Sequence, residues 1–297
     1  MRVLITGCNG QVGHCLTERL KNKADILALD YKGLDVTNRE AVLNTVANFK
    51  PNYIINAAAH TAVDRAEQEV ELSYAINRDG PSYLAQAAKE CGAVMLHIST
   101  DYVFDGTGDK PYQESDGTGP QGIYGQSKLA GEHAVAEHCP QHLILRTAWV
   151  FGEHGNNFVK TMLRLAQSRD ELSIVGDQFG GPTYAGDIAD ALIVMIEHIE
   201  QGQHSGWGTY HFSGMPYASW YAFATKIFQS AESKGVLDKQ PMLSSIPTSA
   251  YPTPAKRPAN SRLDCSKIEN QFGIQPSDWN AALENIQAYK VVNDESY

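Results

Sequence analysis

The feature that most constrains the fold of this 297-residue chain is a glycine-rich turn close to its N-terminus. Residues 2–6 are mostly apolar and indicate a buried strand, and residues 7–13 (Gly-Cys-Asn-Gly-Gln-Val-Gly) follow at once. Apolar residues then recur at every fourth position as far as Leu20, which is typical of a helix packed on a sheet. A second strand-like segment, residues 26–29, ends at Asp30. This order predicts a βαβ unit that binds a dinucleotide.

The residues of this unit suggest how the dinucleotide is held. Gly7, Gly10 and Gly13 permit a tight turn and a close approach of the helix N-terminus to a pyrophosphate. Their spacing is Gly-x-x-Gly-x-x-Gly, and the alternative is a structural turn with incidental glycines. Asp30 stands where a carboxylate accepts hydrogen bonds from the adenosine ribose, whereas Lys32 would offset a 2′-phosphate. NADPH and NADH therefore both remain open.

Strand-like and helix-like segments keep alternating as far as about residue 150, which predicts an α/β fold with a Rossmann-like, doubly wound parallel sheet. The later strand-like segments are residues 53–57, 94–99 and 143–147. The helix-like segments between them are residues 39–49, 67–77, 81–91 and the stretch after 124. Beyond residue 150 the alternation loosens. We predict an NAD(P)-binding domain over residues 1–150 and a smaller α/β substrate lobe over residues 151–297, with some segments returning to the first sheet.

Small and polar residues stand where three of the predicted strands end. Residues 57–61 (Ala-Ala-Ala-His-Thr) would let a cofactor lie against the backbone. Thr100 and Asp101 would project into the ligand crevice, although a strand-end hydroxyl is also ordinary. Trp149, just past the next strand, would lie against a sugar or nicotinamide ring, and a core tryptophan is the alternative. His60 has no partner at ligand spacing, so we predict no metal site.

Tyr124 and Lys128 are four residues apart in a segment of good helix formers, so a helix would place them on one face. A cation beside a phenol favours the phenolate and lowers the tyrosine pKa. Such a tyrosine can exchange a proton with a carbonyl oxygen as hydride arrives. The alternative is an exposed helix pair, because any long helix offers this spacing by chance.

A third group of residues lies late in the chain. Residues 241–258 contain five prolines, which excludes a regular helix or a central strand. Lys256 and Arg257 lie within this stiff stretch and would clamp a diphosphate. A solvated charge pair is equally compatible with the sequence.

Composition limits the partners. The net charge of −10 argues against nucleic acid. No apolar run reaches the length of a membrane span, and the N-terminal segment is strand-like, unlike a signal peptide. Five scattered cysteines without a Cys-x-x-Cys pair argue against a disulfide framework or zinc and for a reducing compartment. We therefore predict a cytoplasmic protein that binds no membrane.

Together these motifs resemble the extended short-chain dehydrogenase/reductase superfamily, and within it the family that reduces dTDP-4-keto-6-deoxyhexoses. The resemblance covers nearly the whole chain and rests on residues 7–13, 56–64, 99–104, 124–132, 146–149, 155–158, 177–180 and 251–258. It implies reduction of the C4 ketone of dTDP-4-dehydro-β-L-rhamnose to dTDP-L-rhamnose with NADPH or NADH, the last step of dTDP-rhamnose biosynthesis. A homodimer is left open.

The resemblance also implies roles for particular residues. Tyr124 would be the proton donor, Lys128 would hold the nicotinamide ribose and acidify Tyr124, and the Thr100 hydroxyl would be the third catalytic group. Gly10, Gln11 and Val12 are implied at the pyrophosphate. Asp30, Asp35 and Val36 are implied at the adenosine. Ala59, His60 and Thr61 are implied at the nicotinamide. The residues implied at the hexulose are Thr100, Asp101 and Trp149.

Two departures and two rivals qualify this resemblance. Residues 14–15 are His-Cys, where some relatives place an acid in a metal-linked dimer contact, so magnesium is doubtful. The short segment between Asp30 and Asp35 bears on cofactor preference.

A nucleotide-sugar dehydratase or epimerase of the same superfamily is one rival, but Tyr102 stands where dehydratases carry a second acid. The other is a non-catalytic subunit similar to methionine adenosyltransferase β, against which the set of Thr100, Tyr124 and Lys128 speaks.

Overall fold

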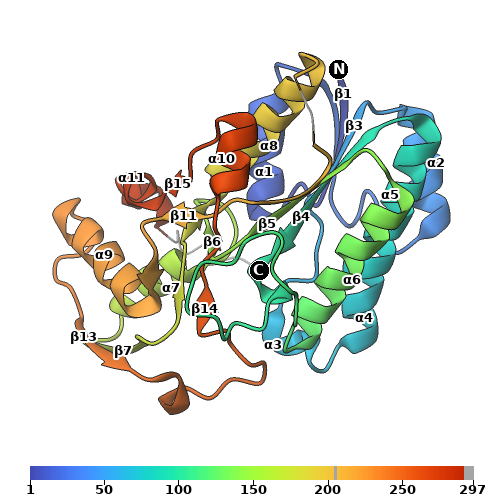
Figure 1. Ribbon diagram of the computed structural model, residues 1–297. Coiled ribbons are helices and arrows are strands. Elements are labelled where there is room, and N and C mark those ends of the chain that lie inside the picture. Colours follow the sequence, from blue (N-terminus) through green and yellow to red (C-terminus); the bar gives the residue numbers. More distant parts are fainter. Residues whose placement is uncertain (204–205, 291–297) are drawn as a thin grey trace.

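The computed structural model describes residues 1–203 and 206–290, in which helices cover both faces of a parallel sheet (Figure 1). Over these ranges the main sheet has six strands in the order β10-β5-β4-β3-β1-β2. They are β1 (Arg2–Thr6), β2 (Asp25–Leu29), β3 (Tyr53–Asn56), β4 (Val94–Thr100), β5 (His142–Thr147) and β10 (Gly208–His211). The strand order reverses beside β1, which is where sheets of this class bind ligands. The predicted Rossmann-like fold is confirmed.

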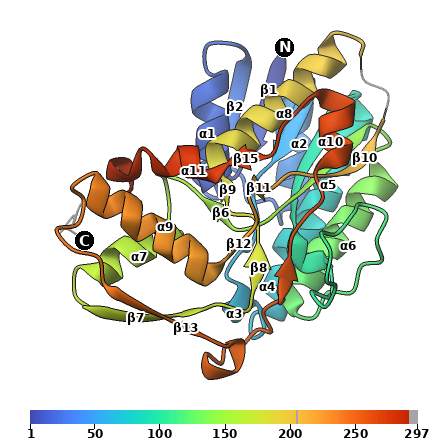
Figure 2. The same ribbon diagram turned by 60° about the vertical axis from the view of Figure 1, so that its left-hand side comes forward.

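Strand residues alternate between the two faces of the sheet, since successive side chains in a strand point to opposite sides. Val3 and Ile5 belong to one apolar cluster and Leu4 to the other. The first cluster includes α1 (Gln11–Leu20), α8 (Ala185–Glu200) and α10 (Ser266–Phe272). The second includes α2 (Arg39–Phe49), α5 (Gly80–Cys91) and α6 (Ile123–His138). Figure 2 shows α1 and α8 side by side on the first face.

Between β3 and α5 the chain forms α3 (Val63–Ala66), α4 (Val70–Tyr74) and one π-helical segment, Ala75–Asp79. The single helix predicted over residues 67–77 is therefore wrong at both limits. The π-helical segment contains Asn77, whose amide bonds to the loop after β3 and to α6. Such local widening of a helix is common at functional sites.

After residue 150, α8, β10 and α10 join the main sheet, and the other elements pack mainly around a separate apolar cluster. Its main elements are α7 (Phe158–Ala166), β7 (Glu171–Val175), α9 (Trp220–Ser233), β13 (Met242–Ile246), α11 (Trp279–Leu283) and the 3₁₀ turn Ile286–Tyr289. The short strands are β6 (Val150–Phe151), β8 (Phe179–Gly180), β9 (Thr183–Tyr184), β11 (Gly214–Met215), β12 (Ala218–Ser219), β14 (Asn260–Ser261) and β15 (Ser277–Asp278). Further 3₁₀ turns span Asp101–Val103 and Thr248–Ala250. Among the described residues, no helix is long and apolar enough to cross a membrane.

A buried ion pair joins α6 to the sheet. Arg146 on β5 donates from Nε and Nη2 to the Glu132 carboxylate at 2.9 and 2.6 Å. Ser99 Oγ donates to the same carboxylate at 2.5 Å. Both charged side chains are almost inaccessible to solvent. A buried pair of this kind adds little net stability, but removal of one partner leaves an uncompensated charge in the core.

We therefore expect Glu132→Ala to lower the free energy of unfolding by about 3–5 kcal/mol, because it strands the Arg146 guanidinium in the core. Urea unfolding at equilibrium measures this loss. The matched control, Glu132→Leu combined with Arg146→Met, removes both charges and should cost clearly less. A loss below about 1 kcal/mol in Glu132→Ala would contradict the expectation.

Candidate active site

The glycine turn lies at the carboxyl end of β1, and close backbone approach fixes two of its glycines. Gly7 has a φ of +70°, and a β-carbon there would lie 2.6 Å from the amide nitrogen of Ala58. A β-carbon on Gly13 would lie 2.1 Å from the carbonyl oxygen of Gly7. The turn leads directly into α1, whose first backbone N–H groups include those of Gln11 and Val12. This tight cradle at a helix N-terminus fits a pyrophosphate.

The carboxylate of Asp30 is held at the end of β2. It accepts from Asn9 Nδ2 at 2.8 Å and from a backbone N–H of the following turn at 2.9 Å. Asp35 accepts from the amide and the hydroxyl of Thr37 at 2.9 and 2.7 Å, and the Val36 side chain is buried in the core. Asp30 is thus a fixed acceptor, whereas the side chains of Asp35 and Val36 support their own loop.

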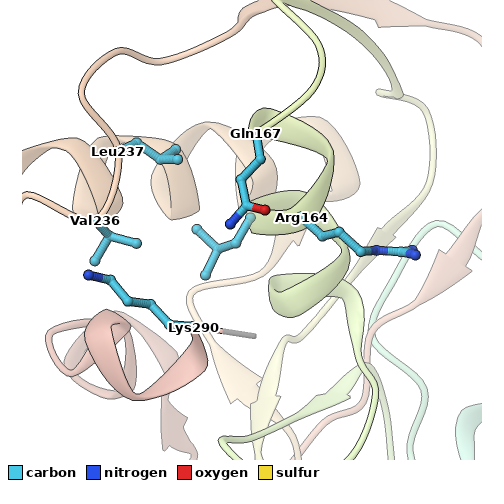
Figure 3. A pocket seen from close by; sticks show the side chains of 6 residues that line it. Arg164, Gln167, Val236, Leu237 and Lys290 are labelled. Atoms are coloured by element: carbon cyan, nitrogen blue, oxygen red, sulfur yellow. The ribbon is translucent and has the colours of Figure 1, made fainter. Parts of the chain in front are cut away.

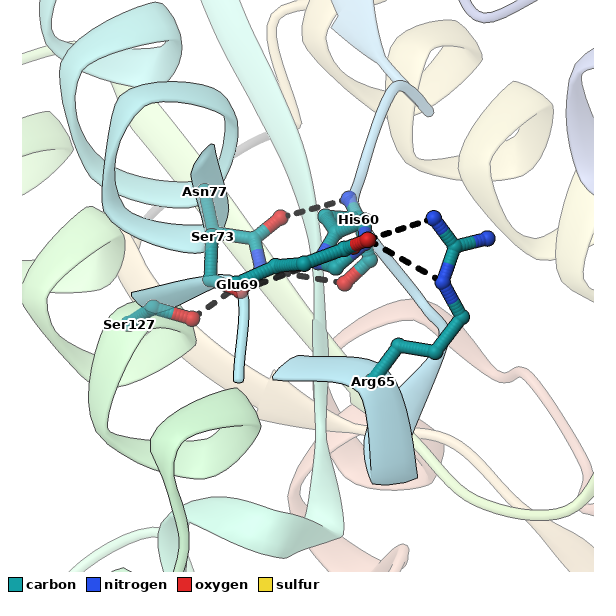
Figure 4. Close-up of polar contacts among 6 residues, drawn as sticks. All are labelled: His60, Arg65, Glu69, Ser73, Asn77 and Ser127. Carbon is teal, nitrogen blue, oxygen red and sulfur yellow. Dashed lines mark hydrogen bonds and ion pairs between the residues drawn. The ribbon is translucent and has the colours of Figure 1, made fainter. Parts of the chain in front are cut away.

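Residues 59–61 follow β3, and Asn77 holds this loop from the side (Figure 4). Asn77 Oδ1 accepts from the His60 amide at 2.8 Å, and Nδ2 donates to the His60 carbonyl at 3.1 Å. Asn77 Nδ2 also donates to Ser127 Oγ on α6 at 3.0 Å. Every hydrogen-bonding atom of this buried amide therefore has a partner, which fixes the loop against the helix of Tyr124.

The His60 ring is held at both of its nitrogens. Nδ1 lies 2.9 Å from Ser73 Oγ, and Nε2 lies 3.0 Å from Glu69 Oε2 (Figure 4). Arg65 also pairs with Glu69, and the two together hold the pKa of that carboxyl below its usual range. His60 thus contacts groups of the protein on both edges of its ring, and among the described residues it belongs to no group of three potential metal ligands.

Tyr124 and Lys128 both lie on α6, as the spacing predicted. Lys128 Nζ donates to the Ile98 carbonyl on β4 at 2.7 Å, and its side chain is almost fully buried. Burial lowers the pKa of Lys128 to about 8, against the opposing effect of Glu132 one turn along the helix. The Lys128 ammonium is therefore charged at neutral pH but loses its proton at only slightly higher pH.

The predicted acidification of Tyr124 is wrong for this structure. Burial raises the pKa of the Tyr124 phenol above its ordinary value, and a hydrogen bond with Thr100 only partly opposes that rise. The negative charges of ionised Asp101 and Tyr102 repel the phenolate and raise the Tyr124 pKa further. Loss of hydration is the largest influence on the phenol, and the Lys128 ammonium is directed at a strand carbonyl.

Asp101 lies beside these groups at the end of β4. Burial raises the pKa of its carboxyl to about 6. Oδ1 accepts from Thr100 Oγ1 at 3.1 Å. Ser261 also opposes the rise in the pKa of this carboxyl, although no described residue makes a hydrogen bond of good geometry to the buried Oδ2. A buried acceptor of this kind suits a hydroxyl group of a ligand.

Trp149 follows β5 in a left-handed backbone conformation, with a φ of +49°. Its indole stacks on Trp220 at a centroid distance of 3.5 Å, and the side chain is half-buried. A non-glycine residue in this conformation stores strain, which is common at ligand clamps. One face of the indole therefore packs on the separate apolar cluster formed after residue 150, as the core alternative predicted. Gln11 reaches the same region, since its Oε1 accepts from Asn157 Nδ2 at 3.0 Å.

Lys256 and Arg257 differ in their surroundings. Lys256 Nζ donates to Gln121 Oε1 at 3.3 Å and is exposed. Arg257 is mostly buried and donates to Asp64 Oδ2 at 2.6 Å and to the Tyr102 hydroxyl at 3.3 Å. The Tyr102 ring packs edge-on against Tyr124 at 5.4 Å. Both cations line a small cavity, together with Tyr102, Phe104, Asp105, Gln121, Gly122 and Pro258. Arg257 is thus a paired cation close to Tyr124.

Two larger cavities contain none of the predicted site residues. One of about 240 Å³ lies between α7 and the end of α9 and is lined by Leu163, Arg164, Gln167, Val236, Leu237 and Lys290 (Figure 3). The other, of about 300 Å³, is lined by His14, Cys15, Glu18, Arg19, Glu153, His154 and Tyr184. His14 and His154 stack there with centroids 4.1 Å apart. Within residues 1–203 and 206–290, no three His, Cys, Asp or Glu side chains form a group that could hold a metal ion.

Sequence reasoning gave no role to three acids that contact the site. Asp64 pairs with Arg257, Glu67 bonds to the start of α6, and Glu69 holds His60. All three come from α3 or the turn after it. No sequence pattern around the acids themselves predicts these contacts, because the partners of Asp64 and Glu67 are distant in the sequence and that of Glu69 lies in a loop without a regular period.

One signal lies near a partner instead. Gly122 at the start of α6 has no capping side chain, so this helix needs an acceptor from another part of the chain.

Comparison with known proteins gives consistent matches. The family model described as RmlD substrate binding domain matches residues 1–291. A dTDP-4-dehydrorhamnose reductase of Aggregatibacter actinomycetemcomitans is 52% identical over 290 residues, which cover 97% of this chain and 99% of that protein. The structure of a dTDP-4-dehydrorhamnose reductase from Clostridium acetobutylicum matches with a TM-score of 0.88 and 41% identity, covering 97% of this chain and 98% of that one. The dTDP-4-dehydrorhamnose reductase of Bacillus anthracis in complex with NADP matches with a TM-score of 0.87 and 41% identity, covering 96% and 98%.

We expect Gly13→Ala to weaken NADPH binding at least about tenfold, because its β-carbon would displace the backbone of the turn from the pyrophosphate position. Titration of cofactor fluorescence measures this affinity. Gly117→Ala is the control, since a β-carbon there meets nothing within 4 Å. Equal affinities in the two variants would show that the turn does not contact the cofactor.

Proposed function

The chain belongs to the dTDP-4-dehydrorhamnose reductase family, and on that premise we propose that it reduces the C4 ketone of dTDP-4-dehydro-β-L-rhamnose to dTDP-L-rhamnose with NADPH or NADH. This reaction is the last step of dTDP-rhamnose biosynthesis. The observation that supports the assignment is the meeting of Thr100, Tyr124 and Lys128 at the carboxyl end of β4. In the sheet that strand end is two strands away from the glycine turn.

The proposed chemistry follows from the protonation states of these groups. Bound NAD(P)H supplies the hydride for C4 of the sugar. Tyr124 keeps its proton at neutral pH because burial raises its pKa, so it can donate that proton to the oxygen on C4. Thr100 holds that oxygen beside the phenol. Lys128 supplies the positive charge that stabilises the phenolate left after the transfer.

The proposed substrate contacts extend from the sugar to the diphosphate. Asp101 would accept a hydrogen bond from a hexose hydroxyl at its unpaired Oδ2. Trp149 would cover the sugar from the other side of the crevice. Arg257 and Lys256 would meet the diphosphate, for which the planar guanidinium is well suited. Tyr102 occupies the position at which dehydratases of the superfamily carry a second acid. The acid that a dehydratase uses for elimination is therefore missing from this chain at that position.

We further propose a cytoplasmic location, since all five cysteines are free thiols. The division at residue 150 and a homodimer stay predictions. The second lobe has its own apolar cluster, while α8, β10 and α10 return to the main sheet, which supports a division with some returning segments.

The assignment is tested by following NADPH and NADH oxidation with a panel of dTDP- and UDP-4-keto-6-deoxyhexoses. Stoichiometric consumption of reduced cofactor with the dTDP-linked 4-keto-rhamnose is expected. A tightly retained NAD that is recycled without net oxidation would instead indicate a dehydratase or epimerase.

Tyr124→Phe should lower kcat at least about a hundredfold, the scale of general-acid catalysis, while cofactor binding is retained. Steady-state kinetics and a cofactor titration measure the two effects. Tyr83→Phe on α5 is the control for loss of a phenol hydroxyl away from the crevice. Turnover at the wild-type rate in Tyr124→Phe would refute the role of Tyr124.

The rate of reduction should stay level to about pH 8 and then fall by about tenfold per pH unit. Burial lowers the pKa of Lys128 to about 8, so its positive charge is lost as the pH rises through that value. Tyr124 does not cause the fall, because its raised pKa keeps the phenol protonated there. A kcat profile, with circular dichroism to monitor folding, measures this, and a level rate to about pH 10 would contradict the Lys128 role.

A further inference from the structure

The helix that carries Tyr124 and Lys128 begins at a residue that has no side chain. The N-cap of α6 is Gly122, which therefore offers no acceptor to the first turn. The first N–H groups of a helix need acceptors, and Ser, Thr, Asp or Asn usually supply one from the N-cap. Tyr124 is the second residue of α6, so a loosened first turn would move the phenol itself.

The missing acceptor comes from Glu67. Its Oε1 accepts from the backbone N–H of Ile123 at 2.9 Å, across 56 positions of sequence. A carboxylate at this place also complements the partial positive charge of the helix N-terminus. Glu67 is half-buried at the end of α3, and α3 packs against α6. The carboxylate is therefore held at the helix start by the packing of its own element.

Gly122 leaves the room that this contact needs. A β-carbon on Gly122 would lie 2.7 Å from Glu67 Oε1. The backbone of Gly122 is extended, with φ −138° and ψ 168°, a conformation that any residue adopts. A side chain at position 122 would therefore displace the Glu67 carboxylate, and a local capping side chain would compete with Glu67 for the same position.

The same short segment holds two other parts of the site. Asp64 accepts from the Ala255 amide at 3.1 Å and from Arg257 at 2.6 Å. Glu69 contacts the His60 ring at 3.0 Å. Residues 64–69 therefore join the loop of the cations, the loop after β3 and the helix of Tyr124. Because Glu67 belongs to this segment, its contact with the start of α6 fixes the position of the Tyr124 phenol relative to both loops.

We propose that Glu67 is a positioning residue of the reductase reaction, which caps α6 from a distant part of the chain and thereby holds Tyr124 beside Thr100. The kinetic consequence rests on the proposed function. The cap itself does not, because backbone hydrogen exchange reports it without any substrate.

The test compares Glu67→Ala with two double variants. Glu67→Ala should lower kcat by about fivefold to tenfold, the change in population that loss of an N-cap produces, with KM for NADPH changed less than about threefold. Hydrogen exchange over residues 119–127 should become faster. Adding Gly122→Ser supplies a local cap in the vacated space and should restore kcat and slow exchange. Adding Gly122→Ala fills the space without an acceptor and should restore neither.

A second pair preserves the size of the side chain at position 67. Glu67→Gln keeps an acceptor oxygen and should retain most of kcat, whereas Glu67→Met lacks one and should show the loss seen in Glu67→Ala. Rescue by serine but not by alanine supports the inference. Equal kcat and exchange in the glutamine and methionine variants overturn it, even if Glu67→Ala does not fold. If the wild-type protein oxidises no NADPH with any 4-keto sugar, the proposed function fails and the exchange measurements alone decide the inference.

Discussion

Parallel strands bring their carboxyl ends to one edge of a sheet, and most candidate functional groups of this chain depend on that constraint. The glycine turn follows β1, Asp30 follows β2, the loop of His60 follows β3 and Thr100 ends β4. Helices cover both faces, so the strands themselves are almost continuously apolar. Most polar groups therefore enter the crevice from the loops past the strand ends, whereas Arg257 comes from a loop of the second lobe. The one helix that contributes catalytic candidates, α6, must be fixed against that edge.

Several polar contacts fix it, and each also satisfies a group that would be costly to bury alone. Lys128 donates to a carbonyl of β4, and Glu132 pairs with Arg146 of β5. The Asn77 amide ties Ser127 to the loop after β3. These contacts come from β4, from β5 and from the π-helical segment that contains Asn77. The position of the helix is therefore set by polar partners as well as by the apolar cluster beneath it.

Burial is the largest influence on the pKa values of three groups in the site. Burial moves each of Asp101, Tyr124 and Lys128 toward its neutral form, so the carboxyl and phenol pKa values rise and the ammonium pKa falls. For a reductase this is useful at the tyrosine, because the protonated phenol is the reactive form. At the lysine it is a cost, and the nearby Glu132 offsets part of it. The spacing of Tyr124 and Lys128 in the sequence therefore does not determine whether the phenol pKa is lowered, because burial decides its direction.

The sequence by itself determined what is written at short spacing. The strand–glycine turn–helix–strand order, the placement of Tyr124 and Lys128 on one helix and the resemblance carried by several motifs all follow from neighbours within a few turns. Only the tertiary structure decided that Arg257 pairs with Asp64, 193 positions away, and that Glu67 caps α6. It also decided the direction of the Tyr124 pKa, which depends on burial. The physical reason is that helix and strand periods are local, whereas desolvation and long-range hydrogen bonds depend on which distant segments pack together.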